Sequence, residues 1–175
     1  MIKKIAYPVL ITLVLVVFFI FAQKTNTVTD RLDTDFSCAY AFLSAEDTTQ
    51  LTTPLTYYKI KGAFNNEVLV NFAIVSDTLT YIGDIPIYFE VILNASFSAS
   101  VVNTTTSIAL YKNNVLQSNS IMTIKLNQTT DTKSLGLVDV LRLENGDNVT
   151  IVITADKTCF VTMHNVNTSI KRFCI

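Results

Sequence analysis

Apolar and polar residues alternate over a long stretch near the middle of the chain. Between Ile85 and Phe97 every second residue is apolar, and the residues between them are mostly polar, with Ile92 as the exception. A period of two over this length is typical of a β-strand with one buried face. The pattern predicts a strand whose buried face carries Ile85, Ile87, Phe89, Val91, Leu93, Ala95 and Phe97.

Shorter stretches repeat this pattern along the rest of the chain. The clearest are 120–127 and 148–155, and no window after residue 25 has the periodicity of a helix. Asn113-Asn114 and Asn145-Gly146-Asp147 favour tight turns, because Asn and Gly tolerate a positive φ. Further strands are predicted at 36–43, 56–61, 67–75, 78–82, 106–112, 136–143, 158–164 and 167–174.

This number of short strands, separated by turns, predicts a sandwich or a barrel. A jelly roll of two packed sheets is the leading interpretation, ahead of an immunoglobulin-like sandwich, because the chain has no Trp for the core of the latter. An up-and-down barrel stays open as an alternative. The predicted fold class is therefore all-β, a single antiparallel jelly-roll sandwich preceded by one N-terminal transmembrane helix.

The N-terminal segment has a different pattern, with no charged residue from Ile5 to Ala22. As a helix it would be about 27 Å long at about 1.5 Å per residue, close to the thickness of a bilayer core. Lys3 and Lys4 precede it, which places the N-terminus on the inside. The predicted anchor residues include Ile5, Pro8, Leu10, Leu13, Val16, Phe19 and Ala22.

The chain is thus divided into a transmembrane anchor (1–24), a polar linker (25–35) and a β jelly-roll domain (36–175). A cleaved signal peptide is the competing interpretation of the first segment. The apolar run is longer than the roughly 7–15 residues usual for such peptides, which favours a retained anchor.

The net charge and the candidate catalytic and metal-binding side chains argue against several classes of function. The net charge is −1 and the basic residues are scattered, which argues against nucleic acid as a partner. His164 is the only histidine, no G-x-S-x-G motif accompanies it, and it is expected to face solvent or pack at an edge. Asp131 and Asp147 are interpreted as turn residues rather than calcium ligands. We therefore expect no enzymatic activity, catalytic residue, cofactor or metal.

The sequence offers two kinds of covalent modification. Of the three cysteines, Cys159 and Cys174 are the predicted disulfide in an exported domain, whereas all three would be thiols in a reducing compartment. Five Asn-x-Ser/Thr triplets are candidate glycosylation sites, although a chain rich in Asn and Thr also forms such triplets by chance. Their asparagines are Asn94, Asn103, Asn127, Asn148 and Asn167.

Several of the predicted strands together resemble a known family. The segments YYKIKGAF (57–64), VNFAIVSDTLTYIGD (70–84), IYFEVILNASFS (87–98), IALYKNN (108–114) and LRLENGDNVTIVI (141–153) are similar to the jelly-roll domains of the C1q and tumour-necrosis-factor superfamily. Similar modules occur in structural proteins of phages and large DNA viruses. The resemblance implies a jelly roll that is often a homotrimer, and it carries over no active site.

These features predict a structural protein, a membrane-anchored minor capsid or virion protein whose jelly roll links a membrane to the capsid shell. Its partners would be the lipid bilayer and other capsid proteins, and its location the virion membrane. The alternative is a type II membrane ligand or adhesion protein of the TNF or C1q kind that binds a receptor. A pilin-like protein is a weaker third hypothesis, because the prepilin cleavage signature is missing.

Overall fold

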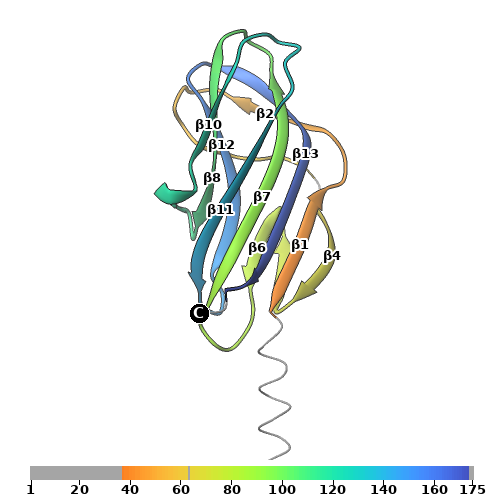
Figure 1. Cartoon of the computed structure of the whole chain (residues 1–175), viewed down its shortest axis with the longest axis vertical. Coiled ribbons are helices and arrows are strands. Elements are labelled where there is room, and N and C mark those ends of the chain that lie inside the picture. Colours follow the sequence, from red (N-terminus) through yellow and green to blue (C-terminus); the bar gives the residue numbers. More distant parts are fainter. Residues whose placement is uncertain (1–36, 63, 174–175) are drawn as a thin grey trace, which may run out of the picture. The chain divides into compact units, whose positions relative to one another are not determined.

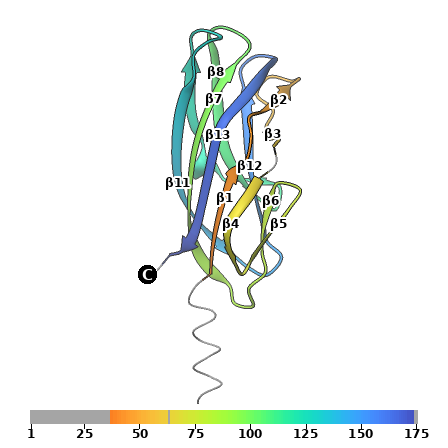
Figure 2. The same ribbon diagram turned by 90° about the vertical axis from the view of Figure 1, so that its right-hand side faces the viewer.

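The structure is a computed structural model of the chain and describes residues 37–62 and 64–173. These residues form two antiparallel β-sheets that face each other (Figures 1 and 2). One short 3-10 helix, η1 (Ser118–Ser120), is the only helix in the described ranges. The predicted anchor, 1–24, and linker, 25–35, lie outside the described residues. None of the described residues belongs to a helix of the length and hydropathy that a membrane span requires.

The first sheet, called sheet A below, has the strand order β11-β7-β13-β1-β4, with β2 paired to another part of β13. All its pairings are antiparallel. The long strands β7, β11 and β13 lie side by side in Figure 1. Its strands are β1 (Cys38–Leu43), β2 (Asp47–Leu51), β4 (Phe64–Val70), β7 (Ile87–Ala99), β11 (Lys133–Leu143) and β13 (Cys159–Arg172).

The second sheet, sheet B, has the order β10-β8-β12-β6-β5. Two short strands extend it, since β3 pairs with β12 and β9 pairs with β8. Its strands are β3 (Tyr58–Lys59), β5 (Phe72–Val75), β6 (Thr78–Tyr81), β8 (Thr104–Lys112), β9 (Val115–Leu116), β10 (Met122–Leu126) and β12 (Asn148–Ala155).

The connections between the sheets are those of a jelly roll. The chain passes from β6 in sheet B to β7 in sheet A and back to β8, and later from β10 through β11 and β12 to β13. Neighbours in each sheet are therefore mostly not consecutive in sequence. In an up-and-down barrel consecutive strands would pair, so that alternative is excluded. The predicted all-β, two-sheet antiparallel sandwich is confirmed.

Strand β7 follows the alternation that predicts it. Six of the seven residues expected to face the core, from Ile87 to Phe97, are buried, whereas Ile85 is 50% exposed. The prediction for Ile85 is wrong because this residue precedes the strand, and its carbonyl accepts a hydrogen bond from the Tyr81 hydroxyl at 2.8 Å. Strand β12 spans 148–155, as its alternation predicts.

Three aromatic rings join the sheets at one end of the core. Phe89 of β7 lies 5.2 Å from Phe72 of β5 and 5.0 Å from Tyr81 of β6, measured between ring centroids. Both pairs are edge-to-face, the arrangement that the ring quadrupole favours. All three side chains are buried, so they form one cluster between sheet A and sheet B.

The predicted turns also have the expected geometry. Asn113 and Asn114 both have positive φ (51° and 64°) between β8 and β9, and Gly146 (φ 86°) lies between β11 and β12. Asp131 accepts the backbone N–H groups of Asn127 and Gln128, which is the turn role predicted for it.

The predicted strands differ from the observed strands in several places. The segment 67–75 is divided into β4 and β5 at Asn71, which has a φ of 60° and lies where the chain passes from sheet A to sheet B. The segments 158–164 and 167–174 are one strand, β13, which continues through an irregularity between Met163 and Asn165. Strand β2 (Asp47–Leu51) was not predicted, because only Leu51 and Thr49 of its five residues are buried.

Candidate functional site

The outer face of sheet A carries an apolar row that crosses all five principal strands. Cross-strand partners point to the same side of a sheet, and the pairings align one residue from each strand. Four of the five residues in the row are apolar or aromatic, and Val138 at one end is 60% exposed. In strand order, from β11 to β4, the row consists of Val138, Ile92, Ser169, Tyr40 and Val68.

The neighbouring row extends this surface. It begins with Val140 on β11 and ends with Cys38 and Val70, which are paired on β1 and β4. Between these ends the Glu90 carboxylate lies 2.7 Å from the ammonium of Lys171, so the two charges in the middle neutralise each other. We refer to the two rows together as the sheet A face. In a sandwich whose outer surface contacts only water these positions are usually polar, so an apolar face of this width indicates a contact surface.

A hydrogen-bonded Ser-His-Glu cluster lies at the other end of the same face. His164 accepts or donates through both ring nitrogens: Nε2 lies 2.9 Å from the Ser98 hydroxyl and Nδ1 lies 2.8 Å from the Glu46 carboxylate. Along β13, Val161 and Met163 face the core, so the ordinary alternation of the strand turns His164 to the outer side. Sequence reasoning placed His164 at the surface or an edge and named neither partner.

The three side chains are connected in the same order as in a Ser-His-acid catalytic triad. The backbone around Ser98, however, differs from that around a catalytic serine. A catalytic serine of the hydrolase type lies at a sharp turn between a strand and a helix, next to backbone N–H groups that bind the oxyanion. Ser98 instead lies within the continuous strand β7. The hydrogen bond from His164 connects the loop that carries Glu46 to the outer surface of sheet A. The Glu46 side chain itself is 63% exposed.

We expect the Ser98→Ala variant to hydrolyse an activated ester such as p-nitrophenyl acetate at the same slow rate as the wild type. The reason is that the hydroxyl has a base beside it but no turn that would assemble an oxyanion hole. Stopped-flow absorbance at the nitrophenolate band measures the rate. A burst of product that is present in the wild type and lost in Ser98→Ala would contradict this expectation.

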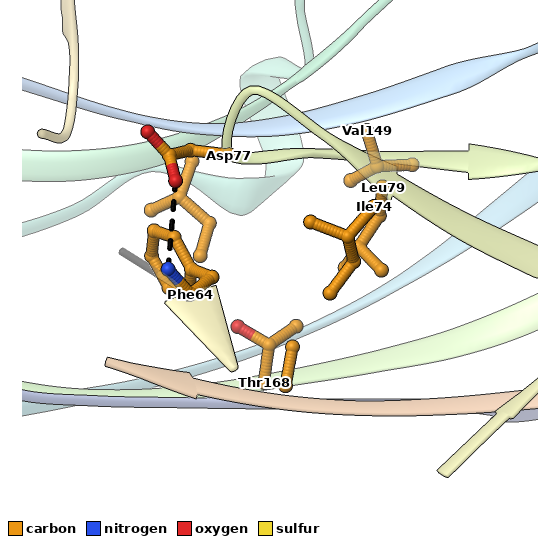
Figure 3. A pocket seen from close by; sticks show the side chains of 8 residues that line it. Phe64, Ile74, Asp77, Leu79, Val149 and Thr168 are labelled. Carbon is orange, nitrogen blue, oxygen red and sulfur yellow. Dashed lines mark hydrogen bonds between the residues drawn. The ribbon is translucent and has the colours of Figure 1, made fainter. Parts of the chain in front are cut away.

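A small hollow lies between the two sheets near β4 and β5, and Figure 3 shows its lining residues. Phe64, Ile74 and Leu79 enclose it, and the Asp77 carboxylate accepts the N–H of Phe64 at 3.5 Å at its rim. Its volume is about 10 Å³, which matches one water molecule. The hollow is therefore too small to bind an organic ligand. Its other lining residues are Ala41, Val149, Ile151 and Thr168.

The predicted glycosylation sites lie in different settings. Asn103 and Asn127 are exposed, and the Asn103 N–H donates to the Asn127 carbonyl, so these two lie at the same end of the sandwich. Asn94 and Asn167 are cross-strand partners on the sheet A side, within the β7–β13 ladder. Asn148 begins β12. Asn103 and Asn127 are thus the two candidates that lie on exposed turns, where a glycan can be attached.

The two described cysteines are thiols on different parts of sheet A. Cys174, the predicted partner of Cys159, lies outside the described residues. Cys159 is the first residue of β13. Its disulfide with Cys174 stays a prediction.

No metal cluster is formed by the described residues. Within 37–62 and 64–173 no group of three or more His, Cys, Asp and Glu side chains is close enough together to hold a metal ion. The predicted anchor residues, from Ile5 to Ala22, lie outside these ranges.

Comparison with known proteins identifies the fold. No protein-family model and no curated protein matches the sequence. Among solved structures, the chain is similar to the Eiger TNF of S. frugiperda, with a TM-score of 0.56 and 8% identity over 80% of this chain and 94% of that one. It is also similar to murine APRIL, with a TM-score of 0.52 and 10% identity over 77% of this chain and 99% of that one.

The fold is a TNF-like jelly roll. The globular domain of zebrafish complement 1qA protein is a further neighbour, with a TM-score of 0.47 and 14% identity over 79% of this chain and 97% of that one. At such identities the likeness shows the fold alone. The predicted resemblance to jelly rolls of this kind is confirmed at the level of architecture by Eiger TNF and murine APRIL, whose TM-scores are 0.56 and 0.52.

Proposed function

We propose that this protein has a structural role: it is held at a membrane by its N-terminal segment and assembles with other proteins through the sheet A face. The apolar row across β11, β7, β13, β1 and β4 carries the proposal. With strands about 4.8 Å apart, the row is about 19 Å wide, which is enough for an extended contact with another folded domain. Its function is binding, and the proposal includes no catalytic step.

The first occupant that we propose for the sheet A face is a second copy of this chain, in a homotrimer. A face with one apolar row and an internally neutralised pair, Glu90 with Lys171, has no uncompensated charge that would repel another copy. The resemblance to C1q and TNF domains implies the same assembly. In a closed ring of three copies, the sheet A face of each copy is covered by a neighbouring copy, and no apolar face stays exposed.

The second part of the proposal is the link between membrane and shell. The uncharged segment from Ile5 to Ala22 would hold each copy in the bilayer, and the jelly roll would dock on neighbouring shell proteins. Each docking contact can be weak, because many anchored copies act together and raise the effective concentration. In this interpretation the chain is a minor capsid or virion protein.

Val138→Lys tests the assembly. Burying three unpaired ammonium groups in the contact costs several kcal/mol, so self-association should weaken by more than about a hundredfold. Val115→Lys is the matched control, because Val115 is 63% exposed, like Val138 at 60%, but belongs to sheet B. Light scattering and sedimentation of the full chain in detergent measure the mass. A wild-type monomer at all concentrations would overturn the trimer.

The membrane–shell link is tested on particles. If the chain is a virion protein, it should remain with purified particles at high salt and be released by detergent, because the anchor resists salt and the docking contacts alone are weak. Release by salt alone, or absence from particles, would contradict the link without bearing on the trimer.

A second candidate function is that of a membrane-bound ligand or adhesion protein. The fold shared with Eiger TNF and murine APRIL supports it, together with the predicted order of anchor, linker and jelly roll. Saturable, protease-sensitive binding of the chain to cells would favour this function over the shell. Recovery with particles and no cell binding would favour the shell.

A further inference from the structure

A cleft lies on the outer face of sheet B, on the opposite side of the sandwich from the sheet A face. Its volume is about 330 Å³, at the lower end of the range of small-molecule sites. Strands β3 and β6, which contribute to it, pair with different parts of β12 (Figure 2). Its lining residues are Tyr57, Lys59, Thr78, Tyr111, Asn114, Asn148, Thr150 and Val152.

Two tyrosine rings form an aromatic corner of the cleft. The centroids of Tyr57 and Tyr111 lie 6.0 Å apart, with the ring planes at 52°. Burial, and to a lesser extent the neighbouring Tyr111, raise the pKa of Tyr57, which keeps its hydroxyl neutral and able to donate. The faces of such rings carry partial negative charge and attract C–H groups that bear partial positive charge.

The polar groups around this corner have unused hydrogen-bonding capacity. Within the described residues, the hydroxyls of Tyr57 and Tyr111 and the side-chain amides of Asn114 and Asn148 make no hydrogen bond. Each amide offers two donors and one acceptor oxygen, and each hydroxyl is both donor and acceptor. A ligand with several hydroxyl groups would use all of them.

The cleft also carries one positive charge and no carboxylate. The Lys59 ammonium donates to the Ser76 carbonyl and, at 2.8 Å, to Thr78 Oγ1, so one of its three N–H groups is left for a ligand. The nearby Lys112 is already paired with Asp147 at 2.8 Å. The charge of Lys59 is therefore the one that a bound anion would meet.

We propose that this cleft binds an acidic sugar, a pyranose ring that carries one carboxylate, at the end of a glycan chain. One C–H face of the ring packs into the corner of Tyr57 and Tyr111, its hydroxyls bond with Asn114 and Asn148, and its carboxylate pairs with Lys59. An extended peptide fits less well, because β12 pairs with β3 on one side and β8 on the other and offers no free strand edge. This function goes beyond the proposed assembly and uses the other sheet.

The cleft on sheet B includes one of the predicted glycosylation sites, Asn148. The triplet from Asn148 to Thr150 lines the cleft, and Thr150 is only 8% exposed and pairs with Tyr111. A glycan attached to Asn148 would fill the cleft. We therefore assign Asn148 to the ligand site, and the binding experiment uses the chain from a bacterial host that adds no N-glycans.

The test titrates the full chain, in detergent micelles, with three probes: the methyl glycosides of N-acetylneuraminic acid, glucuronic acid and glucose. Saturation-transfer NMR and calorimetry measure binding, which should be on the order of millimolar for at least one acidic sugar. Tyr57→Ala and Tyr111→Ala should each weaken it by at least about tenfold. Tyr88→Ala is the matched control, an exposed tyrosine of sheet A, and should leave binding unchanged.

Two further variants separate binding from folding. Asn114→Gly removes the amide from an exposed turn residue and keeps its positive φ of 64° free of strain, and Lys59→Met changes an exposed side chain, so both should keep the wild-type melting temperature. Lys59→Met should lose most of the preference for acidic over neutral sugars. The proposal is overturned if neither acidic sugar binds saturably, if glucose binds as well as the acids, or if Tyr88→Ala weakens binding as much as Tyr111→Ala.

Discussion

The Phe89→Ala variant should lose about 3–5 kcal/mol of unfolding free energy, the usual effect of deleting a fully buried aromatic side chain. Phe89 is fully buried and contacts the rings of both Phe72 on β5 and Tyr81 on β6. Removal of the ring leaves a cavity between the sheets and takes away two edge-to-face contacts. Because the whole stability of a domain of this size is about 5–15 kcal/mol, the variant should be close to unfolding at 37 °C.

Urea denaturation followed by tyrosine fluorescence and far-UV circular dichroism measures this effect. Phe160→Ala is the control: Phe160 is also on sheet A, but 49% exposed, so its loss should cost less than about 1 kcal/mol. Phe89→Leu should fall between the two. A loss for Phe89→Ala no larger than that of Phe160→Ala would mean that the aromatic cluster does not join the sheets.

The inner faces of the strands could be predicted from the sequence, because one buried face imposes a period of two. The apolar positions of β7 and the whole of β12 follow this pattern. Ile92 is the exception to this pattern in β7, because it is apolar at an outward-facing position. It breaks the alternation of β7, and it lies in the apolar row of the sheet A face. Under the proposed assembly, this break is the local sequence signal of an outer face that contacts another copy of the chain.

Pairings between distant strands could not be predicted in this way. The Ser98–His164–Glu46 cluster joins residues that are 66 and 118 positions apart. Their approach depends on the register of β7 with β13, which leaves no mark on the local pattern of either strand. The cleft on sheet B likewise combines the aromatic corner, from Tyr57 and Tyr111, with residues of β3, β6 and β12 and with Asn114 of the β8–β9 turn. These cleft residues come together only through the order of the strands in sheet B.

The two proposed surfaces are compatible with each other. The sheet A face and the cleft lie on opposite outer faces of the sandwich, because β7 and β13 belong to sheet A and β12 to sheet B. Assembly through the sheet A face would therefore leave each cleft open, and copies in one assembly would bind several glycan ends at once. Weak sites repeated in this way give strong overall binding.

Asp147→Ala should lower the unfolding free energy by about 1–3 kcal/mol, because it removes a charged group that accepts hydrogen bonds from three partners. The carboxylate is 15% exposed and joins two turns. Its Oδ2 accepts the Glu144 N–H at 2.8 Å and lies 2.8 Å from the Lys112 ammonium, and its Oδ1 accepts from the Asn113 amide at 2.5 Å. The β11–β12 turn is thereby held to the turn after β8.

The pH dependence of this effect has a definite sign. Burial alone would raise the pKa of Asp147, but the hydrogen bonds from Lys112, the Glu144 N–H and Asn113 outweigh it and lower the pKa below 3.8. A carboxyl group whose pKa is lower in the folded state contributes stability above its unfolded pKa, and this stability is lost as the pH falls through the folded pKa. The difference between wild type and Asp147→Asn should thus be full at pH 7 and shrink below about pH 3.8.

Urea denaturation of both chains from pH 2 to 7 measures the difference. Asp84→Asn is the control, since Asp84 is exposed and its side chain makes no hydrogen bond to the described residues, so its effect should stay within about 0.5 kcal/mol at every pH. A difference for Asp147→Asn that is the same at pH 2 and pH 7 would mean that the shape of the side chain, and not its charge, holds the two turns together. The charge-based account predicts the opposite, because Lys112 has an oppositely charged partner only while Asp147 is ionised.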